Sequence, residues 1–199
     1  MESRVKLAGH PVHPMLIVFP LGLLTTAVVF DIIYLASNAT HWTLASYYMI
    51  AAGIIGGLAA AVPGAVDWWA IPRGTRAKRI GLLHGVGNVI VLALFILSWV
   101  LRRPEPAAPP TGAIVAGLLG VVLAAFTGWL GGELVDRLGV GVDAGAHLDA
   151  PSSLTSQPAT ADARGASPRP SGGPGGADRR TRQPSAYAGI ERRVSGSMR

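Results

Sequence analysis

The chain has 199 residues, of which 50% are hydrophobic and only 14% charged, and it contains no cysteine. Soluble domains usually carry about 25% charged residues, so the composition argues against a soluble protein. The lack of cysteine excludes disulfide scaffolds, thiolate metal sites and cysteine nucleophiles on this chain. Most of the net charge of +6 comes from arginines in residues 151–199, so the rest of the chain gives no support for nucleic-acid binding.

Four apolar stretches each approach the roughly 20 helical residues that cross a hydrocarbon core. Their apolar residues do not alternate with polar ones, and backbone groups in lipid must be satisfied within the segment, so we predict helices. The stretches cover about residues 14–36, 43–66, 80–101 and 112–135. We therefore predict an all-α membrane protein, with an antiparallel four-helix transmembrane bundle in residues 1–145.

The composition changes after the fourth stretch. Residues 146–199 are dominated by Pro, Gly, Ser, Ala and Arg, and such a segment buries too little apolar surface to offset its chain entropy. We predict a disordered C-terminal tail in this range.

The distribution of Lys and Arg predicts the orientation. The segments before the first span, between the second and third, and after the fourth are basic, whereas the first loop has no basic residue. Because basic loops stay in the cytoplasm, we expect both termini on the cytoplasmic side of the inner membrane. Arg102 and Arg103 run against this bias.

Glycines four residues apart occur in three of the predicted spans. Such spacing allows helices to approach closely, although glycine is also simply common in membrane helices. The pairs are Gly53 and Gly57, Gly81 and Gly85, and Gly128 and Gly132.

Several polar residues fall at one depth, near the predicted cytoplasmic boundary. Titratable groups at membrane depth often mark function, but span ends are also where polar residues cost least and serve as helix caps. We expect His13 to cap the first helix, since Pro14 suits the first helical position. The residues at this depth are His10, His13, Asp67, His84, Asn88, Glu133 and Asp136.

Two cofactors are compatible with these residues. A b-type haem needs axial ligands on separate elements, and His13 and His84 are the pair at matching depth. A divalent metal is the alternative, because imidazole and carboxylate ligands suit zinc, manganese or iron. The metal candidates are His10, His13, His84, Asp67 and Glu133. A purely structural role for all of them is a third interpretation.

Asp31 stands apart, in the outer half of the first span. We expect its carboxyl group to hydrogen-bond to Tyr34, Thr43 or Tyr47.

Motifs in chain order resemble the bacterial membrane family called domain of unknown function 2231. They are GHPVHPMLIVFPLGLL at 9–24, AAVPGAVDWWAIP at 60–72, HGVGN at 84–88 and TGWLGGELVDRLGVGVD at 127–143. The resemblance implies a four-span protein without assigned activity. It also implies a Rieske-type iron–sulfur protein as a membrane redox partner, because some relatives are joined to such proteins.

The resemblance also selects positions. Those that carry over are His10, His13, Asp67, His84, Asn88, Gly131, Gly132 and Glu133. The chain departs from the family pattern at Val18 and Leu138, where relatives often have histidine. If those histidines serve a cofactor in relatives, this departure favours a structural role here.

Two functions follow as hypotheses. The first is a non-enzymatic membrane module or accessory subunit, embedded in the lipid bilayer and able to associate with a partner or with further copies of itself. The alternative is a small redox or metal- or haem-binding membrane component with ligands at the cytoplasmic boundary. No catalytic signature supports an enzyme, and the glycines do not form a phosphate-binding loop after a strand.

Overall fold

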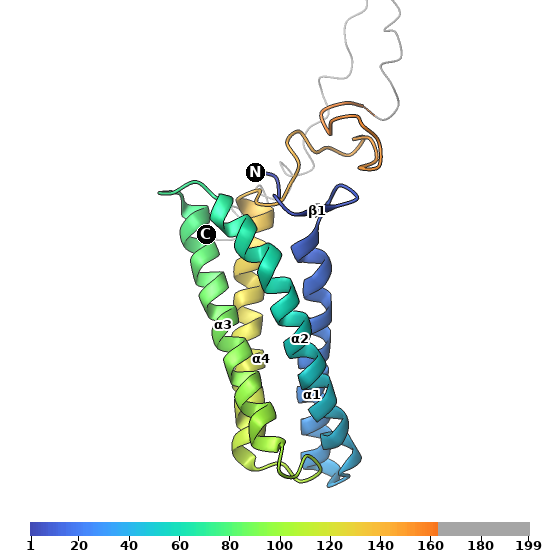
Figure 1. Cartoon of the computed structure of the whole chain (residues 1–199), viewed down its shortest axis with the longest axis vertical. Coiled ribbons are helices and arrows are strands. Elements are labelled where there is room, and N and C mark those ends of the chain that lie inside the picture. The colour runs from blue at the N-terminus through green and yellow to red at the C-terminus, as the bar shows by residue number, and fades with distance from the viewer. Residues whose placement is uncertain (163–199) are drawn as a thin grey trace, which may run out of the picture. The chain divides into compact units, whose positions relative to one another are not determined.

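The computed structural model describes residues 1–162, and this part of the chain holds four long helices in an antiparallel bundle (Figure 1). They are α1 (Val12–Ser37), α2 (His41–Ala70), α3 (Arg76–Arg102) and α4 (Thr111–Gly132). Each is long and apolar enough to cross a membrane. The predicted four-span, all-α architecture is confirmed.

The outer surface of the bundle is apolar, as expected for helices that contact lipid. Large hydrophobic side chains such as Ile55, Val89 and Val122 are at least 66% exposed, whereas Ile50 and Phe95 in the core are fully buried. A protein in water would not expose so continuous an apolar surface. The outer surface of the bundle is therefore suited to contact with the lipid bilayer.

Local sequence signals set the helix ends. Helix α1 ends at Asn38, whose φ of 57° is the left-handed conformation that commonly closes a helix. Helix α3 begins after Thr75, whose side-chain oxygen accepts a hydrogen bond from the backbone N–H of Lys78. Pro20 and Pro63 lie inside α1 and α2, which membrane helices tolerate when neighbouring groups satisfy the freed carbonyls.

One end of the bundle gathers the start of α1, the α2–α3 connection and the end of α4, and we call it the terminal end (Figure 1). A small antiparallel hairpin, β1 (Lys6–Leu7) and β2 (His10–Pro11), precedes α1 there. Its turn uses Ala8 and Gly9, both with positive φ, as tight hairpins require.

This hairpin corrects the prediction for His13. The helix begins at Val12 with Pro11 as its cap residue, so His13 lies within the first turn and does not cap it. The chain reverses at Ala8 and Gly9, and the helix begins at Val12, two residues before Pro14, which the sequence had suggested as the first helical position.

The helices form two hairpins, because α1 packs mainly on α2 and α3 mainly on α4. Part of the glycine prediction is confirmed: a Cβ atom at Gly53 would lie 2.5 Å from Leu24, and one at Gly57 would lie 2.6 Å from Leu92. A Cβ at Gly81 would be 2.7 Å from Trp68. The other three positions make no close helix approach. Gly85 and Gly128 have nothing within 4 Å of that position, and Gly132 only Asp136.

Helix α4 continues as a π-helix, η1 (Glu133–Arg137), and turns follow up to residue 162. These turns contact the N-terminal segment: Ser153 Oγ donates to the carbonyl of Ala8 at 3.1 Å. The predicted disordered tail lies, from residue 163 onward, outside the described residues.

Candidate functional site

His13 is held by the helix beside it. It lies in the first turn of α1, and its Nδ1 is 2.8 Å from the carbonyl oxygen of Ala60 on α2. A carbonyl oxygen only accepts, so Nδ1 carries a proton, and in the neutral ring Nε2 is the nitrogen with the lone pair. The hydrogen bond therefore fixes both the ring orientation and the tautomer.

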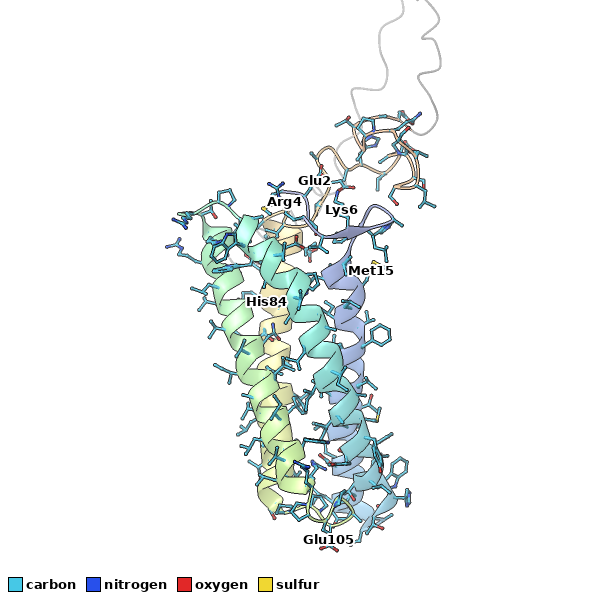
Figure 2. All side chains as sticks on the ribbon, viewed as in Figure 1. Glu2, Arg4, Lys6, Met15, His84 and Glu105 are labelled. Carbon is cyan, nitrogen blue, oxygen red and sulfur yellow. The ribbon has the colours of Figure 1, made fainter. Side chains whose placement is uncertain are left out.

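His84 is held in the same way in the other hairpin. It lies on α3 near the terminal end (Figure 2), and its Nδ1 is 2.8 Å from the carbonyl oxygen of Thr127 on α4. Again Nδ1 is the donor, and Nε2 is the acceptor nitrogen of the neutral ring.

Asn88 lies one turn along α3 and supports this arrangement. Its Oδ1 accepts from the Thr127 hydroxyl at 3.1 Å, which leaves its Nδ2 as a donor. That Nδ2 is 2.9 Å from the carbonyl oxygen of His84 and 3.2 Å from His84 Nε2. Because the same Nδ2 is also 3.5 Å from His84 Nδ1, the amide lies against the imidazole ring, and its shortest hydrogen bond goes to the His84 carbonyl.

The two imidazoles are neighbours between the hairpins. The ring centroids of His13 and His84 are 6.3 Å apart, with the ring planes at 89°, an edge-to-face arrangement. Given nitrogen–metal bonds of about 2 Å, rings at this separation are close enough for one metal ion to take a nitrogen from each.

Glycines make room for both rings. A Cβ atom at Gly64 would lie 2.8 Å from His13 Nδ1, and one at Gly131 would lie 3.1 Å from His84 Cε1. Larger side chains at these positions would push the imidazoles out of place. Gly131 is one of the positions selected by the sequence; Gly64 lies within a quoted motif but was not singled out.

The other candidate ligands lie in different contacts. Asp67 accepts hydrogen bonds from the Ser3 hydroxyl at 2.7 Å and from the backbone N–H of Arg4 at 2.6 Å. Glu133 pairs with Arg76 at 2.6 Å. His10 is exposed on β2, with Nδ1 3.1 Å from Ser153 Oγ. Within residues 1–162, no three His, Asp or Glu side chains gather closely enough to hold a metal ion.

Val18, one of the two positions at which the sequence departs from the pattern that the resemblance implies, points away from this arrangement. Its side chain is 60% exposed on the outer surface of the bundle. A histidine at this position would face lipid and would not join His13 and His84.

The opposite end of the bundle holds a polar cluster that sequence reasoning missed. Asp31 is fully buried and forms a two-pronged ion pair with Arg102, with Nη1–Oδ1 and Nη2–Oδ2 distances of 2.8 and 2.5 Å. The prediction that Asp31 hydrogen-bonds to Tyr34, Thr43 or Tyr47 is wrong. The signal was present, because Arg102 ends an apolar span on the side that should lack basic residues.

The cluster extends beyond the ion pair. Arg102 Nε is 3.3 Å from the Ser98 hydroxyl, and Arg102 Nη1 is 3.4 Å from that of Ser46. Ser98 in turn donates to the carbonyl of Ala113 at 2.7 Å. The guanidinium is thus surrounded by acceptors, which a buried charge requires.

Comparison with known families agrees with this architecture. A family model described as predicted membrane protein (DUF2231) matches residues 9–144, a range that contains all four helices and both histidines of the pair. Comparison with curated proteins and with solved structures gave no significant match. Because the matched range covers well over half of the chain, this protein belongs to the DUF2231 family of predicted membrane proteins.

Proposed function

We propose that the chain is a non-enzymatic membrane module that holds one metal centre between its two hairpins, with His13 and His84 as ligands. The observation that carries the proposal is the pairing of two imidazoles, each with Nδ1 bound to a backbone carbonyl. Metal-binding histidines characteristically donate their second ring N–H to such a carbonyl, which fixes the ring and makes the free nitrogen a better ligand.

The number of ligands favours haem iron. A b-type haem would be held by His13 and His84 as its two protein ligands and would supply one-electron transfer. Each imidazole is anchored within its own hairpin through Nδ1, so Nε2 is the nitrogen that each ring would offer to a metal. Asn88 Nδ2 would give up its contact with His84 Nε2 and keep its hydrogen bond to the His84 carbonyl.

The test is spectroscopic. Protein purified in mild detergent is examined by absorption spectroscopy, oxidised and reduced, and by metal analysis. His13→Ala and His84→Ala are compared with His41→Ala, which alters a histidine that packs on Trp42 outside the site. A Soret band lost in the first two variants and kept in the third supports haem. Stoichiometric metal with the same dependence, but no Soret band, supports a bare ion. A colourless, metal-free protein contradicts the proposal.

The expected partner follows from the family resemblance. A redox protein of Rieske type would be the natural neighbour of a metal centre at the membrane boundary. Co-purification of the tagged full chain, compared with the His84→Ala variant, tests this part. Recovery of no iron–sulfur protein with either form would contradict it.

We propose that the terminal end faces the cytoplasm, across the inner membrane. Basic residues are concentrated there: Arg4, Lys6, Arg73, Arg76, Lys78, Arg79 and Arg137. At the opposite end Arg102 is buried in the bundle and paired with Asp31, so within the described chain Arg103 is the one basic residue that lies in a connection on that side. The excess of Lys and Arg at the terminal end supports the proposed orientation.

A further inference from the structure

The two hairpins repeat the same contacts at the same register. In α1–α2, His13 binds the carbonyl of Ala60; in α3–α4, His84 binds the carbonyl of Thr127. His84 follows His13 by 71 residues, and Thr127 follows Ala60 by 67.

The contacts at glycines in the two hairpins are separated by the same two sequence intervals. Leu24 covers Gly53 in the first hairpin, as Phe95 covers Gly120 in the second. His13 covers Gly64, as His84 covers Gly131. Each residue of α3 again follows its α1 counterpart by 71 positions, and each glycine of α4 follows its α2 counterpart by 67. The membrane domain is therefore a tandem repeat of one two-helix unit.

Asp31 and Arg102 are also counterparts, since they are 71 residues apart. Residues at equivalent positions of two repeats meet each other only near the axis that relates the repeats. Both this pair and the pair His13–His84 therefore lie at that axis, one toward each end of the bundle. At the end opposite the terminal end, the first repeat therefore carries a carboxylate at the position where the second repeat carries a guanidinium.

We propose that Asp31 and Arg102 are a pairing-specificity element that makes the first hairpin recognise the second. Two copies of the first hairpin, packed on this face, would oppose two buried carboxylates. Two copies of the second would oppose two buried guanidiniums. Only the mixed pairing neutralises both charges, and an uncompensated buried charge strongly disfavours the alternatives.

The partner of each hairpin is the other hairpin of the same chain. The short connection Ile71–Thr75 between α2 and α3 is closed by reciprocal contacts. Trp68 Nε1 donates to the carbonyl of Lys78 at 3.2 Å, and Lys78 Nζ donates to the carbonyl of Trp68 at 2.7 Å. The ammonium of Lys78 also lies 4.0 Å from the Trp68 ring centroid. This closed connection favours pairing within one chain over exchange between two chains.

The absence of native cysteine allows a direct test in the full chain. Gly57→Cys with Leu92→Cys places a disulfide reporter between α2 and α3, which contact each other at these positions. The reporter is combined with Asp31→Arg, with Arg102→Asp, with both reversals, and with the neutral pair Asp31→Asn and Arg102→Gln. Intramolecular crosslinking in membranes and molecular mass in detergent are measured.

We expect each single reversal to lower the intramolecular crosslink at least about tenfold, because it leaves two like charges buried. The double reversal should recover most of the crosslink and the monomeric mass. The neutral pair should fold and form more dimer than the unaltered chain, because like hairpins are no longer repelled and only the α2–α3 connection still favours pairing within one chain. The proposal is overturned if the single reversals crosslink as the unaltered chain does, if the double reversal is no better than the singles, or if the neutral pair stays strictly monomeric.

This test is independent of the metal centre. It reads the distance between hairpins and the mass of the assembly, neither of which requires a bound group. Loss of the proposed function would therefore leave this inference standing, and failure here would leave the histidine pair untouched.

Discussion

The Ser3 hydroxyl donates to the Asp67 carboxylate at 2.7 Å across 64 residues of sequence. This contact, with that of Arg4 N–H to the same carboxylate, fastens the N-terminal segment to the end of α2. Glu2, Arg4 and Lys6 all lie at this end of the bundle (Figure 2). A residue proposed as a metal ligand thus has a structural role of its own.

Replacing Asp67 should therefore loosen the N-terminal segment. Asp67→Ala removes both acceptors, and each hydrogen bond to a charged group contributes about 1.5–3 kcal/mol. We expect faster hydrogen exchange at residues 3–5 with unchanged helix content. Asp67→Asn, which keeps one carbonyl acceptor, should show a smaller effect. Unchanged exchange together with loss of bound metal would instead identify Asp67 as a ligand.

Gly64 and Gly131 should tolerate alanine poorly. The new methyl groups would lie 2.8 Å from His13 Nδ1 and 3.1 Å from His84 Cε1, so the rings must move off their carbonyl partners. We expect a loss of about 1–3 kcal/mol in thermal unfolding in detergent, together with a lower metal or haem content.

The matched controls for these variants are Gly85→Ala and Gly128→Ala. Neither position has an atom within 4 Å of the added Cβ, and alanine is the better helix former by about 1 kcal/mol. Stability should be equal or higher in the controls. If all four variants behave alike, crowding of the imidazoles is not the cause.

The N-terminal segment should respond to pH at both extremes. Lys6 bonds to Asp143 at 2.5 Å and to Glu2 at 2.9 Å. The hydrogen bond with Lys6, and then that from Ala144, lower the pKa of Glu2. The hydrogen bonds with Asp143 and then Glu2 raise the pKa of Lys6.

The directions of the two pKa shifts define a pH range in which both contacts are present. The Glu2 contribution is present above the usual carboxyl pKa of 4.5 and is lost as pH falls through the lowered value. The Lys6 contribution is present below the usual pKa of 10.5 and is lost as pH rises through the raised value. Limited proteolysis of residues 1–8 should be slowest between these limits and faster in high salt, which screens exposed charges. A rate independent of pH and salt would contradict this.

The orientation can be read with single cysteines. Arg73→Cys lies in the α2–α3 connection, and Glu105→Cys lies at the opposite end (Figure 2). A membrane-impermeant maleimide applied to intact cells, with the outer membrane permeabilised where there is one, should label position 105 and spare position 73. Labelling should become equal after the inner membrane is opened. The reverse pattern would place the histidine pair at the outer side.

The sequence predicted the spans well, because continuous apolar runs of this length have few alternatives. It also predicted that His13 and His84 share a depth, since this follows from counting residues along antiparallel helices. It could not predict the partners of Nδ1. The carbonyl of Ala60 contributes no side chain, and nothing in the sequence distinguishes it from the other carbonyls of α2.

Asp31 shows the opposite case, in which the signal existed but pointed elsewhere. Nearby hydroxyl groups in α1 and α2 suggested local partners, whereas the true partner lies at the end of α3. Once the helices are placed antiparallel, an acid and a base at the same depth of two apolar spans are far better matched to each other than to neutral groups. Depth, rather than proximity in sequence, was the informative coordinate.

The Asp31–Arg102 pair also constrains how the protein is made. Asp31 emerges from the ribosome 71 residues before Arg102, so α1 and α2 enter the bilayer while the acid has no counter-ion. That early intermediate is stabilised only when the third span arrives with its guanidinium. Synthesis halted between the two residues should thus leave a nascent chain dependent on insertase or quality-control factors, and completion of α3 should release it.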